Sequence, residues 1–314
     1  MNNTLLITGG AGFIGSSLAE QLALKGYKVV VADNLVTGEL AKIPSHEQVN
    51  FCQCDVNNFR ELSDVFSRYS PDYVFHYAAL VGVQRTLQNP LMVLEDIKGI
   101  ESVLKLSKDY QIKRVFYASS SEVYGEPVEI PQNEFTTPLN SRLPYAIVKN
   151  VGEAYFRSYQ KQYALDFTIF RFFNTYGPKQ SRDFVVSKFI NAALKNQPIT
   201  IHGDGMQTRT FCFIDDHIEA TVKAFEQNLF VNDVINIGSD NEITILELAQ
   251  RIIRLTESRS KIVHLPALEE GDMRRRLPDN SKMLSILQRE LLPLEQGIGR
   301  ILADSKFIVD QCVA

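Results

Sequence analysis

One stretch near the start of the chain constrains the fold more than any other. It runs from Thr4 to Asp33 and spells TLLITGGAGFIGSSLAEQLALKGYKVVVAD. An apolar run, a glycine-rich turn, an amphipathic segment and a second apolar run predict a strand, a tight turn, a helix and a strand. Glycines in such a turn let the backbone approach a pyrophosphate, which then binds the amides at the positive end of the helix dipole. The glycines of this turn are Gly9, Gly10, Gly12 and Gly15.

The acidic residue that ends the second strand indicates which dinucleotide would bind. Asp33 lies 18 positions after Gly15, close to the spacing of roughly 20 expected for a carboxylate that hydrogen-bonds an adenosine ribose. It is followed by Asn34 rather than by arginine, so a 2′-phosphate would be repelled. The sequence therefore predicts NAD as the cofactor, although glycines alone would also fit a purely structural turn.

Size and charge limit the remaining possibilities. With 314 residues the chain can bury a large core, and we expect one large domain and a smaller one. The formal net charge of −4 argues against nucleic acid or an anionic membrane as a partner. No apolar run reaches the roughly 18 residues that span a bilayer. No basic segment precedes the first apolar run, so we expect a cytoplasmic protein.

The cysteines and histidines do not form a metal-binding pattern. Cys52 and Cys54 lie two positions apart on one expected strand, so they point to the same face, but no second pair completes a zinc site. The histidines show no spacing typical of metal ligands. We therefore predict no metal and expect the cysteines to be free, buried thiols. They are Cys52, Cys54, Cys212 and Cys312.

Strand-like and helix-like segments alternate along the chain, which predicts an α/β fold with a doubly wound parallel sheet and a smaller C-terminal substrate-binding lobe. We place the NAD-binding domain at residues 1–174, with 216–239 returning to it, and the lobe at 175–215 and 240–314. Ligands of such sheets bind beyond the carboxyl ends of the strands. Beyond the second strand, the first domain is expected to contain strands at 49–54, 73–76, 114–119 and 167–172 and helices at 59–69, 91–110 and 145–163.

Two residues at helical spacing could carry acid–base chemistry. Tyr145 and Lys149 lie four positions apart in the segment PYAIVKN, so on a helix they share one face. A tyrosine ordinarily titrates at roughly pH 10, but a neighbouring ammonium and an oxidised nicotinamide both stabilise the phenolate. Such a base could remove an alcohol proton while the carbon-bound hydrogen leaves as hydride. Alone the pair is common on helices, but together with the dinucleotide turn it indicates catalysis.

The polar segment ASSSEVYG follows the strand expected at 114–119. One of its hydroxyls could hydrogen-bond the reacting oxygen beside the tyrosine, although a polar turn after a buried strand would also contain serines. Its glutamate is more informative, because a carboxylate at the catalytic edge of a sheet can move a proton or orient a water. The side chains concerned are Ser119, Ser120, Ser121 and Glu122.

Together, TGGAGFIG, ASSSEVYG, the Tyr-x-x-x-Lys pair and RFFNTYGP resemble the extended short-chain dehydrogenase/reductase family, specifically its NAD-dependent nucleotide-sugar epimerases, dehydratases and decarboxylases. The resemblance covers almost the whole chain. It implies cofactor contacts from Gly9, Gly12, Phe13, Ile14, Gly15, Asp33, Asn34, Asp55, Val56, Ala78, Ala79, Ser119, Tyr145 and Lys149. It implies catalytic roles for Tyr145, Lys149, Ser120 and Glu122, and substrate contacts from Ser121, Asn174, Arg209 and one of Arg275 or Arg276.

Enzymes of that branch oxidise C4 of the sugar, use the ketone for a second step and return the same hydride, so NAD is not consumed. The Ser121-Glu122 pair and the segments VVSKFI, GDGMQTRTF and RRRLPD resemble UDP-glucuronate decarboxylases, with arginines suited to phosphate or carboxylate. The segments YAALVGVQRT and LPYAIVKN are closer to epimerases, and Asp96 stands where many relatives have asparagine. We therefore expect a UDP-sugar enzyme, with UDP-glucuronate decarboxylase ahead of a UDP-hexose or UDP-uronate 4-epimerase and of a nucleotide-sugar dehydratase.

Two further expectations concern assembly and class. The helices expected at 91–110 and 145–163 are apolar over much of their surface, and relatives dimerise through such helices, so the resemblance implies a homodimer. The alternative is that those side chains all face their own sheet. A non-catalytic NAD-sensing or scaffold protein on the same fold is the alternative from another functional class.

Overall fold

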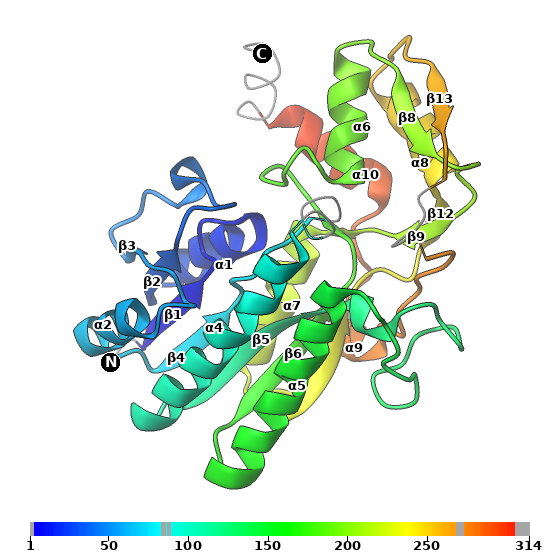
Figure 1. The fold of residues 1–314 in the computed structure, drawn as a ribbon. Coiled ribbons are helices and arrows are strands. Elements are labelled where there is room, and N and C mark those ends of the chain that lie inside the picture. Colours follow the sequence, from blue (N-terminus) through cyan, green and yellow to red (C-terminus); the bar gives the residue numbers. More distant parts are fainter. Residues whose placement is uncertain (1–2, 83–85, 87–88, 268–272, 305–314) are drawn as a thin grey trace. The chain divides into compact units, whose positions relative to one another are not determined.

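The computed structural model of the protein describes residues 3–82, 86, 89–267 and 273–304. The chain divides into two compact units (Figure 1). Unit 1 comprises Met1–Gly125, Leu139–Phe172 and Ile218–Ile235, and unit 2 comprises Glu126–Pro138, Phe173–His217 and Asn236–Ala314.

Unit 1 is organised around a parallel sheet. Its strands are β1 (Thr4–Thr8), β2 (Lys28–Asp33), β3 (Val49–Gln53), β4 (Tyr73–His76), β5 (Arg114–Ser120), β6 (Phe167–Phe172) and β11 (Asp233–Ile237). The seven strands lie in the order β11-β6-β5-β4-β1-β2-β3. In register, β1 pairs with β2 and β4, and β5 pairs with β4 and β6, all in parallel. The predicted α/β class with a doubly wound parallel sheet is confirmed.

Helices cover this sheet, and local sequence signals set where several of them begin. The Asn58 side chain caps one helix by accepting the amide hydrogens of Arg60 and Glu61. Pro90 and Pro144 stand in the first turns of two others, where a missing amide hydrogen removes no helical bond. The helical segments are α1 (Phe13–Leu24), η1 (Leu40–Lys42), α2 (Phe59–Tyr69), α4 (Pro90–Asp109), η2 (Ser121–Tyr124), α5 (Pro144–Tyr163) and α7 (Ile214–Glu226).

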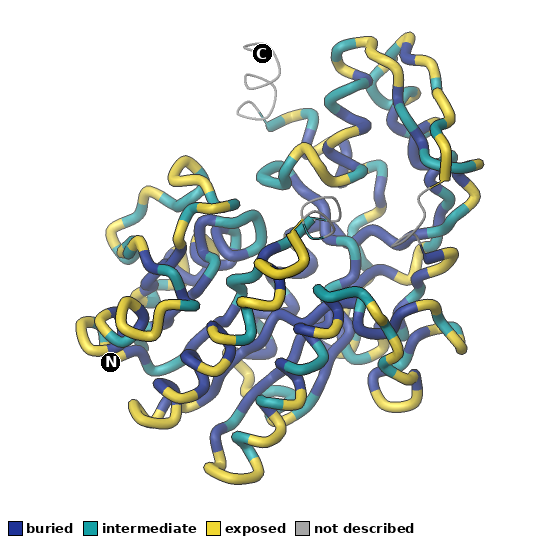
Figure 2. The backbone as a smooth tube through the Cα atoms, viewed as in Figure 1, coloured by how far each residue is buried: buried dark blue, intermediate teal, exposed yellow. Residues whose placement is uncertain are grey.

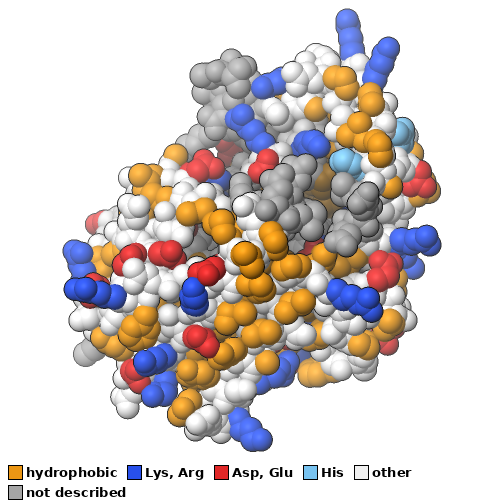
Figure 3. Space-filling model, in the orientation of Figure 1, with side chains coloured by type: hydrophobic (Ala, Val, Ile, Leu, Met, Phe, Trp, Pro, Cys, Tyr) orange, Lys and Arg blue, Asp and Glu red, His pale blue; other side chains and the backbone are white. Residues whose placement is uncertain are grey.

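Alternate residues of the central strands pack on opposite faces of the sheet, as the strand period of two requires. On β4, Val74 joins the buried cluster that includes side chains of α2, α4 and α5. The next residue, Phe75, instead lies edge-on to Phe225 of α7, with ring centroids 5.8 Å apart. The strands are therefore buried on both faces, which Figure 2 shows as continuous dark segments. Not all apolar groups are covered, since hydrophobic side chains also gather on the surface over α4 and α5 (Figure 3).

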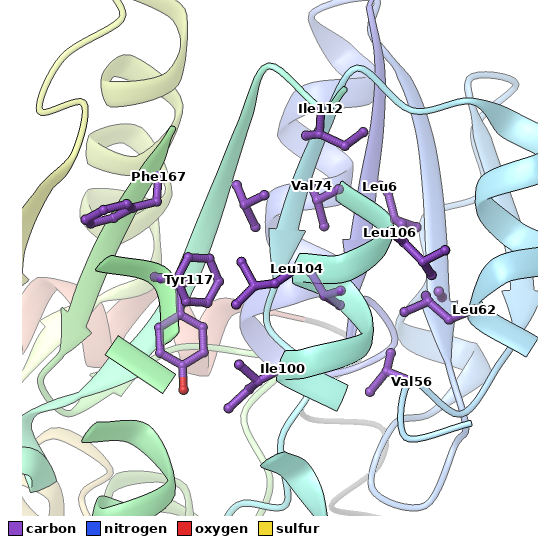
Figure 4. Packing of buried hydrophobic residues seen from close by; sticks show 14 of the residues in the cluster. Leu6, Val56, Leu62, Val74, Ile100, Leu104, Leu106, Ile112, Tyr117 and Phe167 are labelled. Atoms are coloured by element: carbon purple, nitrogen blue, oxygen red, sulfur yellow. The ribbon is translucent and has the colours of Figure 1, made fainter. Parts of the chain in front are cut away.

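A glycine allows α5 to pack closely on β5. Tyr117 of β5 is buried among the side chains shown in Figure 4 and stacks on Phe156, with ring centroids 4.7 Å apart. A Cβ added to Gly152 of α5 would lie 2.2 Å from the Tyr117 hydroxyl oxygen, far inside van der Waals contact. Only glycine therefore fits at this point, and the contact sets how closely α5 approaches the sheet.

The described part of unit 2 contains short helices and three two-stranded sheets, β10-β7, β12-β9 and β13-β8. In the Gly297 turn of α10 (Leu294–Ala303), a Cβ would lie 2.0 Å from the Tyr176 hydroxyl oxygen, so this unit also relies on a close glycine contact. Within the described ranges, no helix of either unit combines the length and apolarity that crossing a bilayer requires. The elements of unit 2 are β7 (Thr175–Tyr176), α6 (Val185–Leu194), β8 (Ile199–His202), β9 (Thr208–Thr210), β10 (Cys212–Phe213), β12 (Glu242–Thr244), α8 (Ile245–Leu255), β13 (Ile262–Leu265), α9 (Ser281–Leu287) and α10 (Leu294–Ala303).

Two features of unit 2 differ from what the sequence pattern predicted. The segment Glu126–Pro138, which the predicted division assigned to the first domain, packs with unit 2. The Gln132 amide donates to the Leu277 carbonyl at 2.7 Å, and the Asn236 amide donates to the Glu134 carboxylate at 2.8 Å. Strand β9 forms at the end of a polar run where no strand was predicted, because its partner β12 lies far along the chain.

Candidate active site

The glycine turn after β1 packs against the residues that follow β4. Gly9 has a φ of +69°, and a Cβ there would lie 2.6 Å from the Ala78 amide nitrogen. A Cβ on Gly15 would lie 2.4 Å from the Gly9 carbonyl oxygen. Gly12, the residue that precedes α1, has no side chain to cap the helix amides. This bare, closely packed helix start fits the pyrophosphate of a dinucleotide, which needs accessible amides at the positive end of a helix.

The Asp33 carboxylate at the end of β2 is held from two sides. It is 7% exposed, and its oxygens accept the amide hydrogens of Ala11 at 3.0 Å and Leu35 at 2.8 Å. Gly38 packs against it, because a Cβ there would lie 2.6 Å from Oδ1. The carboxylate is thus fixed beside the glycine turn, where it can accept hydrogen bonds from ribose hydroxyls. Asn34 instead bonds locally to the Val36 amide.

The other residues predicted to contact the cofactor lie at or near the same edge of the sheet. Asp55 follows β3, accepting the Asn57 amide hydrogen at 2.9 Å, while the side chain of Val56 is buried in the core. The Ala78 amide donates to the Thr8 hydroxyl at 3.3 Å. Those that remain partly exposed are Phe13, Ile14, Asp55, Ala78 and Ala79.

Tyr145 and Lys149 occupy the first turns of α5, as their spacing predicted. The Lys149 ammonium lies 5.7 Å from the centre of the Tyr145 ring and 5.1 Å from that of Tyr117. Burial lowers the pKa of Lys149 to about 8, while the Asp96 carboxylate opposes that shift. The site therefore brings a phenol together with a buried amine whose pKa is lowered by burial.

Two further titratable groups, the partly buried Asp96 and the buried His76, are coupled electrostatically to Lys149. Asp96, on α4, accepts the Leu80 amide hydrogen at 2.8 Å, and burial raises the pKa of its carboxyl while this bond and Lys149 oppose the rise. His76, at the end of β4, shares a 2.8 Å hydrogen bond with the Thr8 hydroxyl. Burial, and then Lys149, lowers the pKa of His76 to about 3, so its ring is neutral and adds no positive charge.

The serines after β5 have different surroundings. The Ser120 hydroxyl oxygen accepts the Glu122 amide hydrogen at 3.2 Å, so its own proton remains available for a further partner. Ser121 is buried, whereas Glu122 is only partly buried. The Ser119 hydroxyl donates to the Glu153 carboxylate at 2.6 Å. Sequence analysis missed Glu153, although its position one helical turn after Lys149 signals a shared face.

Asn174 and the arginines predicted to bind substrate all belong to unit 2. The Asn174 side chain donates to the Thr210 carbonyl at 3.1 Å. Arg209 is buried and donates to the Met273 carbonyl at 2.7 Å. Arg275 is about half exposed and pairs through two hydrogen bonds with Glu242, whereas its neighbour Arg276 is 6% exposed.

The described cysteines are free, but they differ in burial. Cys54 and Cys212 are buried, whereas Cys52 is only partly buried and donates weakly to the Tyr69 hydroxyl. Cys312 lies outside the described residues. Among the side chains that the structure describes, no group of three or more His, Cys, Asp or Glu residues could hold a metal ion.

Comparisons with known proteins show the family of this chain. Residues 5–238 match the NAD dependent epimerase/dehydratase family. A UDP-N-acetyl-alpha-D-glucosaminuronate decarboxylase from Bacillus cytotoxicus is 36% identical, over 95% of this chain and 96% of that protein. A UDP-glucuronate 4-epimerase from Thermodesulfobacterium geofontis is 32% identical, over 96% of this chain and 95% of that protein. A UDP-glucose 4-epimerase from Thermotoga maritima, solved with UDP-glucose, superposes with a TM-score of 0.92 at 30% identity, covering 98% of this chain and 99% of that one.

We predict that Gly15→Ala weakens NAD binding by at least about tenfold, because the added methyl group would force apart the closely packed turn. Isothermal titration calorimetry with NAD measures the change. Gln21→Ala, an exposed position of the same helix, serves as the control and should bind NAD as the wild type does. Equal affinities of the Gly15 variant and the wild type would contradict the assignment of the turn.

Proposed function

The chain belongs to the NAD-dependent epimerase/dehydratase family of nucleotide-sugar enzymes, and within it we propose a UDP-uronate decarboxylase, with UDP-glucuronate as the first candidate substrate. The observation that carries the C4 oxidation, which is the first step of the proposed reaction, is the pairing of Tyr145 with the buried Lys149 on α5. The decarboxylase relative supports the choice of outcome. We assign NAD to unit 1 and recognition of the nucleotide to unit 2.

NAD, when bound, accepts a hydride from the substrate and returns it, which supplies the redox chemistry. The chain would hold this group through the amides around Gly12 and Gly15 and through the Asp33 carboxylate, which is fixed beside the turn. The Ser119 hydroxyl donates its hydrogen bond to Glu153, so we assign any cofactor contact of Ser119 to its main chain. The remaining residues assigned to the cofactor are Gly9, Phe13, Ile14, Asn34, Asp55, Val56, Ala78, Ala79, Tyr145 and Lys149.

Oxidation at C4 requires a base for the hydroxyl proton. We assign this role to Tyr145, whose phenolate is stabilised by the Lys149 ammonium. The Ser120 hydroxyl already accepts the Glu122 amide hydrogen, so it is set to donate its proton to the substrate oxygen. Tyr145 returns the proton when the ketone is reduced at the end of the cycle.

Decarboxylation follows from the chemistry of the ketone. With C4 oxidised, the C6 carboxylate is β to a carbonyl, so the C5–C6 bond can break and leave its electron pair in the enolate at C4 and C5. Carbon dioxide departs, and C5 is then protonated. We assign Glu122 to moving that proton or orienting the water that delivers it, and we assign Ser121, in the same turn, to contacting the sugar.

Recognition of the anionic end of the substrate is assigned to unit 2. Planar guanidinium groups bind phosphate or carboxylate bidentately, and Arg209 and Arg276 are both buried there. Arg276 is favoured over Arg275, because Arg276 is 6% exposed whereas the Arg275 side chain is about half exposed. Asn174 is assigned to the diphosphate.

A 4-epimerase is the second candidate, and its support comes from the epimerase relatives. In that reaction the ketone turns over in the site and is reduced from its other face, so the mass of the sugar does not change. A dehydratase would instead remove the C5 proton and expel water. All three outcomes share the C4 oxidation and the roles of Tyr145 and Lys149.

We also propose that the protein is a homodimer formed through the apolar surface over α4 and α5 (Figure 3). On this surface Leu91 is 78% exposed and Ile147 is 41% exposed. Burying such side chains against a second copy removes apolar area from water.

We expect a Leu91→Lys/Ile147→Lys variant to sediment as a monomer in analytical ultracentrifugation. Val128→Lys, which is equally apolar and 66% exposed but lies elsewhere, should leave the dimer intact, and a monomeric wild type would refute the proposal.

The mass of the products tests the proposed reaction. Incubation with UDP-glucuronate should release carbon dioxide and yield a UDP-pentose by mass spectrometry, whereas unchanged mass would indicate epimerisation and loss of water would indicate dehydration.

Tyr145→Phe should lower kcat by roughly 10³-fold, as removal of a general base does. Wild-type activity of this variant would refute the assigned base.

The pH dependence of kcat tests the role of Asp96. Since burial lowers the pKa of Lys149 to about 8 and Asp96 opposes this, Asp96→Asn should lower that pKa further. The ammonium is then lost at lower pH, so the alkaline decline of kcat should move down by roughly one pH unit. Asp109→Asn, at the exposed end of the same helix, is the control. Superimposable profiles of Asp96→Asn and wild type would contradict the assignment.

A further inference from the structure

A buried ion pair joins the helix that carries Tyr145 and Lys149 to the sheet. Glu153 of α5 and Arg171 of β6 each have a side chain that is 2% exposed. The Arg171 Nε donates to Glu153 Oε1 at 2.9 Å and its Nη2 donates to Oε2 at 2.7 Å. This is the two-bond geometry in which a guanidinium and a carboxylate interact most strongly.

Each member of the ion pair also holds a hydroxyl group. Glu153 Oε1 accepts the Ser119 hydroxyl at 2.6 Å. Arg171 Nη1 donates to the Tyr124 hydroxyl oxygen at 2.8 Å, and the guanidinium carbon lies 4.8 Å from the centre of that ring. We refer to Ser119, Tyr124, Glu153 and Arg171 as the buried network.

Glu153 links the buried network to Tyr145 and Lys149, because all three residues belong to α5. Tyr145, Lys149 and Glu153 are four residues apart in turn, so they lie along one face of α5. Since Glu153 is fixed to β6 through Arg171, the network controls how α5 is rotated and how far it slides along its axis. A shift of α5 would move the Tyr145 hydroxyl with it.

The network reaches the other candidate residues through β5 and η2. Ser119 directly precedes Ser120 on β5, and it pairs in register with Arg171. Tyr124 closes η2, the short helix that contains Glu122. Fixing these two hydroxyls therefore fixes the backbone on both sides of the Ser120 and Glu122 side chains.

We propose that the Glu153–Arg171 pair positions the catalytic groups, setting Tyr145 and Lys149 relative to Ser120 and Glu122. The proposal rests on the proposed function of this site. Stability alone would not need the pair, because well-packed apolar residues often replace a buried ion pair without loss. An apolar pair could not direct the hydroxyls of Ser119 and Tyr124, so these residues are positioning residues and none of them is assigned to contact the sugar.

The test compares two buried arginines of unit 1. Arg114, at the opposite end of β5, is 2% exposed and donates to the carbonyls of Leu229 and Ala224. We expect Arg171→Met to lower kcat by roughly 10²-fold, as small misplacements of catalytic groups do, with KM changed less than about threefold. Arg114→Met should destabilise the protein but keep kcat within about twofold of the wild type. Equal losses of kcat in both variants would overturn the proposal.

A double variant separates positioning from stability. Glu153→Leu/Arg171→Met removes both charges, so its thermal unfolding temperature should recover relative to Arg171→Met while kcat stays low. Recovery of kcat together with stability would overturn the proposal. If either Arg171 variant does not fold, Ser119→Ala and Tyr124→Phe remove one hydroxyl each and should each lower kcat by about tenfold. Wild-type kcat in both hydroxyl variants would equally overturn it.

A readout without turnover distinguishes failure of this inference from failure of the proposed function. The NMR signal of Tyr145 in isotope-labelled protein, assigned with Tyr145→Phe, reports the surroundings of the phenol whatever the substrate. It should shift in Arg171→Met and stay in place in Arg114→Met. If no UDP-sugar is turned over but the signal shifts in this way, the reaction assignment falls and the positioning role stands; an unshifted signal removes the positioning role.

Discussion

The candidate site of unit 1 depends on a close backbone contact between the glycine turn after β1 and the residues that follow β4. A Cβ on Gly9 would lie 2.6 Å from the Ala78 amide nitrogen, so no other residue fits without moving one of the strands. The strand order reverses at this point, because β2 and β3 lie on one side of β1 while β4, β5 and β6 lie on the other. Such a reversal leaves a crevice at the carboxyl edge of a parallel sheet, which is where ligands of these folds bind. The start of α1, which follows β1, and the start of α5, which carries Tyr145, therefore both lie at the carboxyl edge of this sheet.

The buried charges near this edge are stabilised in different ways. Lys149 has aromatic rings around it and a carboxylate acting only at longer range, so burial dominates and its pKa falls. Burial alone would lower the pKa of Arg171 as well, but the hydrogen bonds and charge of Glu153 raise it, and the guanidinium stays charged. Removing one partner of a buried pair typically costs about 3–5 kcal/mol, a large share of the roughly 5–15 kcal/mol that stabilises a domain. Unit 1 thus contains one buried basic group with a lowered pKa, Lys149, and one that its ion pair keeps charged, Arg171.

Adjacent arginines of unit 2 have separate surroundings. The Arg275 guanidinium lies against Glu242, and its hydrogen bonds lower the pKa of that carboxyl. Arg276 is buried at the next position. Under the function proposed above, the C4 oxidation is common to decarboxylation and epimerisation, and the step that follows distinguishes the two. Membership of the family therefore supports the proposed C4 oxidation more strongly than it supports any one step after it.

The sequence by itself determined the features that depend on local spacing. The α/β class, the glycine turn with Asp33, and the shared helix face of Tyr145 and Lys149 follow from residues a few positions apart, whose geometry a strand or helix fixes at once. Only the tertiary structure decided the partners that lie far apart in the chain. These include the pairing of Glu153 with Arg171, the antiparallel pairing of β9 with β12, and the packing of 126–138 in unit 2. Arg171 is the charged residue of the apolar strand FTIFRF, and hydrophobic periodicity carries no information about which distant side chain pairs with it.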